Sequence, residues 1–369
     1  MKFMPYFLLV NFTLRNCLTV NAADNIILSR AGTTLTDTNF DLKRLVKYGV
    51  KIADYFKYEP DIQWEYASQL GVRYAVGRMP DGHMDEFAGS FEALRGMKER
   101  LEKRGFLLKV IEPAPPNQKI KLGLPGRDEE IQHMCTLIEN MGKLGIEVLC
   151  YNFMAYFNWE RTGFDYPERG GALVSYYDHS RTDHTQLTDA GIVSHRRLWE
   201  NLEYLQKAIV PVAERAGVKL ALHPDDPPVP GIRGVGRILI SADAMEKAIN
   251  IVPSPNMGIA MCQGSFQAMG ENVVECIRRF GSKIHFAHFR DTRGGRYCFH
   301  ETFHDNGPTD MAQVIRAYRD TGYKGYVRVD HVPAMAGEHP DHPGYGSVGR
   351  LFATGYLKGL MEMAGCLED

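Results

Sequence analysis

The stretch that decides the fold is KLALHPDDPPVP (219–230), in which an apolar run ends in a histidine, two aspartates and a group of prolines. Proline fixes φ and removes a backbone donor, so this exit holds the side chains of His223, Asp225 and Asp226 in place. A loop that served only to turn the chain would use glycine or asparagine. The stretch therefore predicts a buried strand whose carboxyl end carries a site.

Composition narrows the class of protein. The 369 residues are 44% hydrophobic and 24% charged, with a net charge of −2, so there is no basic excess to indicate a nucleic-acid partner. No run reaches the roughly 18 apolar residues of a membrane span. Seven cysteines without a C-x-x-C pair argue against a disulfide scaffold, which favours a reducing compartment and a cytoplasmic location.

Residues 1–45 are set apart as an N-terminal extension, and 46–369 are expected to form a single domain. The first 24 residues have Lys2, a short apolar patch and a small-residue NAA site, as in a secretory signal. Pro5 and the polar residues that follow it are poor for a signal core, which favours a disordered extension or an overlong start and leaves export as the alternative.

Short apolar runs alternate with longer amphipathic stretches along the rest of the chain. Three of these stretches (91–105, 128–145 and 195–217) are expected to be helices that close on a glycine. Alternation of this kind predicts a parallel sheet covered by helices, here an α/β fold of the (β/α)₈ TIM-barrel type. The eight expected strands are 50–56, 72–78, 107–113, 147–153, 219–224, 257–264, 283–290 and 326–331.

The segment 154–191, which follows the fourth strand, is long and aromatic for a connector and is expected to be a functional loop over the barrel mouth. In such barrels the chemistry lies at the carboxyl ends of the strands. Those ends carry His223, Cys262, His288 and Asp330, each about one βα unit from the next. Two imidazoles, a thiolate and a carboxylate are ligands that suit a divalent transition metal.

Other polar residues have simpler interpretations. Cys150 and Cys276 are expected to be small buried hydrophobic residues. His285 and His288 are three apart, so they face opposite sides of their strand, and His285 is expected to pack against the helices. Asp226 is expected to orient the residues that bind the metal and not to bind the metal itself.

Several motifs occur in one order: HPDDPP, CQGS, HFR, FHETFHDNG and PGYGSVGRL. Together they resemble the mannonate dehydratase family, from about residue 50 to 360 and most densely after 222. YNFMAYFNWERTG (151–163) is similar to the aromatic segment of that family. The resemblance implies a xylose-isomerase-like barrel and a hydro-lyase that removes water from a sugar acid, converting D-mannonate to 2-keto-3-deoxy-D-gluconate.

The resemblance also implies roles for individual residues. His223, Cys262, His288 and Asp330 match the ligands of Mn²⁺, or alternatively Fe²⁺. His331 and Tyr345 match the residues that move protons, without an assignment of acid and base between them.

Two departures from the family concern the substrate more than the metal. Val329 and Val332 replace the proline and glycine of the usual RPDHG, and ADYFKYEP stands where the family has Arg-Trp-Tyr-Gly.

Four further residues are candidates for contact with the substrate. A guanidinium binds a carboxylate bidentately, which makes Arg290 the first candidate for the substrate carboxylate, with an external salt bridge as the alternative. Asn152, Asp225 and His304 are candidates for the polyol. Glu301 and His304 lie on a loop beyond the seventh strand that is expected to lie over the site.

The expected partner is a small sugar acid, with no nucleic acid or membrane, and the chain is expected to form a homo-oligomer. The alternative function is a metal-dependent sugar isomerase or epimerase on the same barrel. A barrel that only binds a sugar acid or stores metal is a third possibility.

Overall fold

The computed structural model describes residues 29–30, 33–34, 49–78, 89–338 and 344–368. The chain divides into two units, Met1–Val46 and Lys47–Asp369. In the first unit the short strands β1 (Ser29–Arg30) and β2 (Thr33–Thr34) pair antiparallel. The rest of the N-terminal extension lies outside the described residues, so the expectations for it stay predictions.

The second unit is built on a closed barrel of eight parallel strands, in the order β12-β13-β16-β3-β4-β5-β6-β9. The predicted TIM barrel is confirmed, and each expected apolar run contains one barrel strand. The strands are β3 (Lys51–Phe56), β4 (Tyr74–Gly77), β5 (Leu107–Ile111), β6 (Val148–Asn152), β9 (Lys219–His223), β12 (Met257–Cys262), β13 (Ile284–Phe289) and β16 (Tyr326–Val329).

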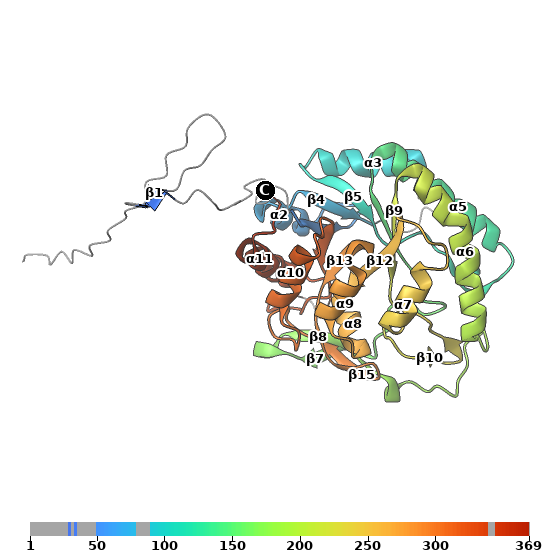
Figure 1. The fold of residues 1–369 in the computed structure, drawn as a ribbon. Helices are drawn as coiled ribbons and strands as arrows, with labels where there is room; N and C mark the ends of the chain where they lie inside the picture. Colours follow the sequence, from blue (N-terminus) through green and yellow to red (C-terminus); the bar gives the residue numbers. More distant parts are fainter. Residues whose placement is uncertain (1–28, 31–32, 35–48, 79–88, 339–343, 369) are drawn as a thin grey trace, which may run out of the picture. The chain divides into compact units, whose positions relative to one another are not determined.

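Helices cover the outside of the barrel (Figure 1). They are α2 (Ile62–Gln69), α3 (Phe91–Glu102), α4 (Gln118–Leu122), α5 (Arg127–Leu144), α6 (His195–Ala216), α7 (Ala242–Ile249), α8 (Gln263–Met269), α9 (Val273–Phe280), α10 (Met311–Asp320) and α11 (Ser347–Ala364). The described residues contain no helix that is both long and apolar enough to span a membrane.

Two of the three predicted helix ends are confirmed. α5 and α6 stop at Gly145 and Gly217, both with φ 68°, where glycine avoids the steric penalty of a left-handed cap. The expected end at Gly105 is wrong. α3 stops at Glu102 because Lys103 forms a right-handed cap, and the positive φ falls in the turn that follows.

Buried side chains form separate layers inside and outside the barrel. The inner cluster takes residues from all eight strands, small ones such as Ala53 and Ala221 together with the rings of Phe286 and Tyr326. The larger cluster lies between strands and helices. Strands that are apolar on both faces fit between these layers, as the continuous burial of β12 and β13 shows.

The segment 154–191, expected to be a functional loop over the barrel mouth, contains two strands and is not loop alone. β7 (Gly163–Pro167) and β8 (Leu173–Asp178) pair with β14 (Thr292–Gly295) and β15 (Cys298–Glu301), which follow the seventh barrel strand, in the order β14-β15-β8-β7. We call these four strands the accessory sheet. In Figure 1 its strands β7, β8 and β15 lie together at the lower end of the barrel.

The remaining short elements are β10 (Gly231–Ile232), β11 (Val235–Gly236), η1 (Arg169–Gly171), η2 (His179–Arg181) and η3 (Gly281–Lys283).

Candidate metal centre and active site

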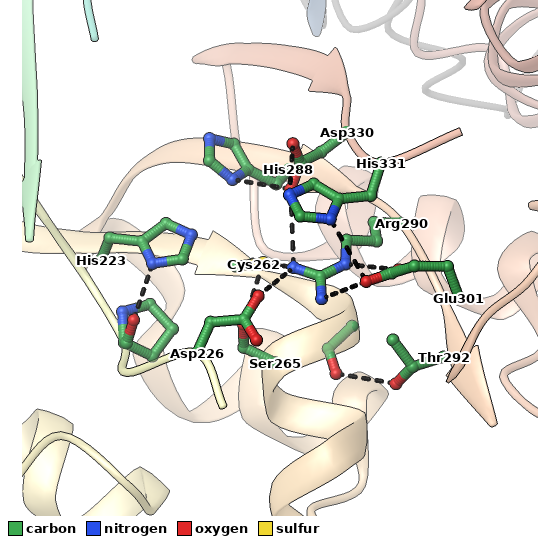
Figure 2. A network of polar contacts seen from close by, with 12 residues as sticks. His223, Asp226, Cys262, Ser265, His288, Arg290, Thr292, Glu301, Asp330 and His331 are labelled. Atoms are coloured by element: carbon green, nitrogen blue, oxygen red, sulfur yellow. Dashed lines mark hydrogen bonds and ion pairs between the residues drawn. The ribbon is translucent and has the colours of Figure 1, made fainter. Parts of the chain in front are cut away.

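Three of the four predicted metal ligands converge at the carboxyl end of the barrel. His223 ends β9, Cys262 ends β12 and His288 lies one residue before the end of β13. Their ligand atoms all lie within 4.8 Å of one another, and all three residues are buried. Figure 2 shows the two imidazoles and the cysteine around one point, each contributed by a different strand.

Local contacts aim two of these side chains. The Nδ1 atom of His223 lies 2.7 Å from the carbonyl oxygen of Pro224, which can only accept, so Nδ1 carries the hydrogen and Nε2 keeps its lone pair. The Cys262 sulfur accepts hydrogen bonds from Ser265 and Arg290, both at 3.2 Å. Thiolate is the form of cysteine that binds metals, and both donors point at this sulfur.

His288 provides the test of whether a metal fits. It is 1% exposed, and neither ring nitrogen makes a well-aligned hydrogen bond, although Nε2 lies 3.1 Å from a Glu112 oxygen. Buried polar atoms without partners are rare in proteins and call for a ligand. Two imidazoles and a thiol around such orphaned nitrogens fit a divalent transition metal.

Asp330, the fourth predicted ligand, lies beside this group but outside the cluster of three. One carboxylate oxygen accepts from Arg328 at 2.8 Å, and the other lies 3.5 Å from His288 Nδ1. Burial alone would raise the pKa of Asp330, but His331 and Arg328 hold it well below its ordinary value. The side chain is therefore a charged carboxylate at the edge of the candidate metal centre.

The predicted proton-transfer residues lie next to each other. The hydroxyl of Tyr345 is 3.5 Å from His331 Nε2, and the Trp159 ring packs on His331 with centroids 4.9 Å apart. His331 has φ 39°, a left-handed conformation that is uncommon outside glycine. Backbone hydrogen bonds of Asp330 and Val332 hold it there from both sides.

A cavity of about 520 Å³ joins three of the four predicted metal ligands, His223, His288 and Asp330, to this pair, and Cys262 is not among its lining residues. That volume is in the usual range for a small-molecule site. Asn152 lines the cavity, as predicted for a substrate-binding residue. Asn152 Oδ1 accepts from the buried Lys121 amine at 2.8 Å, and Nδ2 donates to Asn158 Oδ1 at 3.4 Å, which leaves the second hydrogen of the NH₂ group for the substrate. The residues of the segment 154–191 that line the cavity are Met154, Asn158, Trp159 and Phe164.

Arg290 lines the cavity, and most of its donors bind other residues of the chain. Its Nε and Nη2 donate to the two oxygens of Glu301 at 2.8 Å, and Nη1 lies 2.9 Å from Asp226. The side chain is 0% exposed. These contacts use most of the donors of Arg290 to hold other side chains, and its contact with the substrate carboxylate stays a prediction.

Asp225 and His304, also predicted to contact substrate, do not line the cavity. Asp225 accepts from the Leu239 backbone at 2.8 Å and lies 3.7 Å from Arg237. His304 binds the Phe289 carbonyl oxygen at 2.8 Å. Asp226 lines the cavity, whereas its neighbour Asp225 does not.

Three other sequence interpretations meet different outcomes. His285 lies buried against the Leu220 carbonyl oxygen, on the opposite side of β13 from His288, and burial lowers its pKa to about 4. Cys276 is a buried residue of α9, as expected. Cys150 is buried too, but it also lines the cavity, and its sulfur lies within 4.8 Å of ligand atoms of Glu112 and His288.

Sequence reasoning missed three charged residues of the site, Glu112, Arg161 and Arg328, and it placed Glu301 only on a loop beyond the seventh strand, without a role. Glu112 pairs with Arg328 at 2.8 Å, and Arg161 binds both oxygens of Asp226 at 2.7 and 2.9 Å. Glu112 could have been found, because it ends the third predicted strand. Arg161 and Glu301 lie outside the barrel strands and 140 positions apart, so strand register gives no signal for them.

Known proteins resemble this chain over most of its length. The family model of D-mannonate dehydratase (UxuA) matches residues 55–193 and 184–366. Mannonate dehydratases from Thermotoga maritima and Streptococcus equi subsp. zooepidemicus are each 36% identical over 79% of this chain, and over 91% and 87% of their own lengths.

Among solved structures, mannonate dehydratase from Streptococcus suis serotype2 superposes with a TM-score of 0.79 at 32% identity, over 87% of this chain and 96% of its own. A D-psicose 3-epimerase from Clostridium cellulolyticum H10, at 14% identity and a TM-score of 0.55 over 87% of this chain and all of its own, shares the fold. The converging strand ends and the extent of these matches lead to one conclusion: this chain belongs to the D-mannonate dehydratase family.

Proposed function

We propose that the chain dehydrates D-mannonate to 2-keto-3-deoxy-D-gluconate with the help of Mn²⁺ or Fe²⁺. The observation that carries the proposal is the convergence of His223, Cys262 and His288 beside the cavity that also contains His331 and Tyr345. Asp330 completes the predicted ligand set. A divalent ion held there would stabilise negative charge on the substrate oxygens as a proton leaves C2.

The reaction requires two proton transfers. The C2–H bond breaks and its proton passes to a base, while the C3 hydroxyl leaves with a proton from an acid as water. The enol that remains then loses the proton of its C2 hydroxyl and gains one at C3, which gives the 2-keto-3-deoxy acid. We assign these transfers to His331 and Tyr345 together, because their polar atoms lie side by side at the cavity.

The surrounding residues support this chemistry. Trp159 and Phe164 cover the pair with apolar surface, which strengthens electrostatic interactions within the site by keeping water away. The NH₂ group of Asn152 suits a hydroxyl or carboxylate oxygen of the substrate.

The test is to incubate the full chain with D-mannonate and Mn²⁺ and to measure the 2-keto-3-deoxy acid formed. Chain stripped of metal by a chelator should be inactive and should recover when Mn²⁺ is restored. Ketohexoses offered under the same conditions should remain unchanged. Epimerised ketohexose without any dehydrated aldonate would replace this proposal with the isomerase or epimerase alternative.

A cytoplasmic location and a homo-oligomeric state belong to the same proposal. The six described cysteines are all unpaired, which fits a reducing compartment. Size-exclusion chromatography with light scattering would measure the oligomeric state.

A further inference from the structure

A carboxylate of the accessory sheet reaches into the active site. Glu301 is the last residue of β15, so it comes from neither the barrel strands nor their immediate ends. Its Oε1 atom lies 3.2 Å from His331 Nδ1, and Glu301 is 1% exposed. Figure 2 shows Glu301 and Arg290 on the far side of His331 from Asp330.

Two arginines fix this carboxylate. Arg290 donates to both of its oxygens at 2.8 Å, and Arg161 Nη2 donates to Oε1 at 2.7 Å. Asp226 balances the second positive charge by pairing with both arginines. Two buried arginines and two buried carboxylates therefore form a balanced network, which holds Glu301 in one position.

The contact has a consequence for the histidine ring. A carboxylate can only accept, so the hydrogen of His331 lies on Nδ1, facing Glu301. Nε2, next to the Tyr345 hydroxyl, then presents a lone pair to the cavity. A carboxylate behind a catalytic histidine sets the tautomer and orientation of the ring in other enzymes.

We propose that Glu301 is a positioning residue that fixes the tautomer and orientation of His331, and that the accessory sheet is thereby part of the catalytic apparatus. The proposal rests on the proposed function only in taking His331 as a proton-transfer residue. If Glu301 positions His331, then Arg161, which binds Glu301 and lies in the segment after β6, contributes to the same positioning.

The contacts of His331 also allow the other tautomer, in which Nε2 carries the hydrogen. Arg161 Nη2 lies 3.5 Å from His331 Nδ1, so it could donate to that nitrogen if the hydrogen were on Nε2. The Asp330 oxygen 3.7 Å from Nε2 would favour this form, but it already accepts from Arg328. The two arrangements differ in which ring nitrogen carries the hydrogen, and that can be measured.

The first experiment records nitrogen–proton NMR correlations of the full chain labelled with ¹⁵N-histidine, both metal-free and with diamagnetic Zn²⁺. The His331 signals are identified by their absence in His331→Asn. The proposal predicts a hydrogen on Nδ1 in the wild type. A hydrogen on Nε2 would overturn it, whatever the enzyme does to D-mannonate, so failure of the proposed function is a separate result.

The second experiment compares Glu301→Gln with Asp291→Asn. Glu301→Gln should lower kcat by about 10² to 10⁴-fold and leave KM within a few-fold and metal content unchanged, as expected for loss of orientation behind a catalytic histidine. It should also change the His331 nitrogen signals. Asp291 is a buried carboxylate whose side chain bonds only Thr292 and Thr309, so its variant controls for general destabilisation.

Full kcat in Glu301→Gln would contradict the proposal. If that variant does not fold, the wild-type tautomer alone still decides between the two arrangements.

Discussion

The two ends of the barrel differ in how far particular polar side chains are hydrogen-bonded. At the amino end, the hydroxyl of Tyr326 donates to Glu147 at 2.8 Å and the Lys51 amine donates to the Lys324 carbonyl at 3.0 Å. At the carboxyl end, neither ring nitrogen of His288 makes a well-aligned hydrogen bond to the described residues, and the nearest carboxylate oxygens, of Glu112 and Asp330, lie 3.1 and 3.5 Å away. At these positions the polar groups of the amino end are hydrogen-bonded, whereas a candidate metal ligand of the carboxyl end keeps its ring nitrogens available for an ion.

The largest expected effect comes from removing a ligand at the carboxyl end. Cys262→Ala should lower turnover about a thousandfold or more, because several kcal/mol of charge stabilisation is lost with the metal. Metal analysis of the purified variant should show reduced content. Cys276→Ala, which changes a buried cysteine of α9, is the matched control and should keep both metal and activity. Equal loss in the two variants would contradict the ligand role.

A smaller effect is expected when the metal stays and proton transfer fails. His331→Asn and Tyr345→Phe should each lower kcat by about 10² to 10⁴-fold, the usual contribution of general acid–base catalysis, with metal content unchanged. Turnover within a few-fold of wild type in either variant would remove that residue from the mechanism.

Stability against acid should depend on histidines away from the cavity. Burial lowers the pKa of His285 and of His304 to about 4, whereas an unfolded histidine titrates near 6.5. Between these values the unfolded chain binds more protons, so stability is present above about pH 6.5 and is lost as the pH falls toward 4. Each residue contributes a slope of up to about 1.4 kcal/mol per pH unit.

Urea unfolding at pH 7 and pH 5 measures this slope. His285→Asn keeps a donor for the Leu220 carbonyl and should flatten the dependence while turnover at pH 7 stays unchanged. An unaltered slope in this variant would show that His285 does not contribute to it.

The smallest effect is expected at the amino end. Tyr326→Phe removes the hydrogen bond to Glu147 and should cost about 1 kcal/mol of unfolding free energy. Turnover should stay within about two-fold. A large loss of turnover in this variant would show that the two ends are not separable.

The sequence sufficed for the parts of the molecule that follow strand periodicity. The eight apolar runs predicted the barrel strands, and the spacing of His223, Cys262 and His288 by whole βα units predicted that they share one rim. The three-residue separation of His285 and His288 placed them on opposite faces for the same reason.

What could not be predicted depends on contacts between distant segments. Glu301 meets Arg161 across 140 positions, and pairing of β15 with β8 sets that contact. The sequence also does not show that Glu301 and Asp226 use most of the donors of Arg290, the residue predicted to bind the substrate carboxylate. Asp225 was assigned to the site because the direction of each aspartate depends on the local backbone.

The central claim is that one ion is bound by side chains from separate strands. Crystals of the full chain grown with Mn²⁺, measured at the manganese absorption edge, test it most directly. The account predicts an anomalous peak within bonding distance of His223 Nε2, Cys262 Sγ and a ring nitrogen of His288. A peak bound through Glu112 and Cys150 with Cys262 unligated, or a peak at the amino end of the barrel, would contradict it.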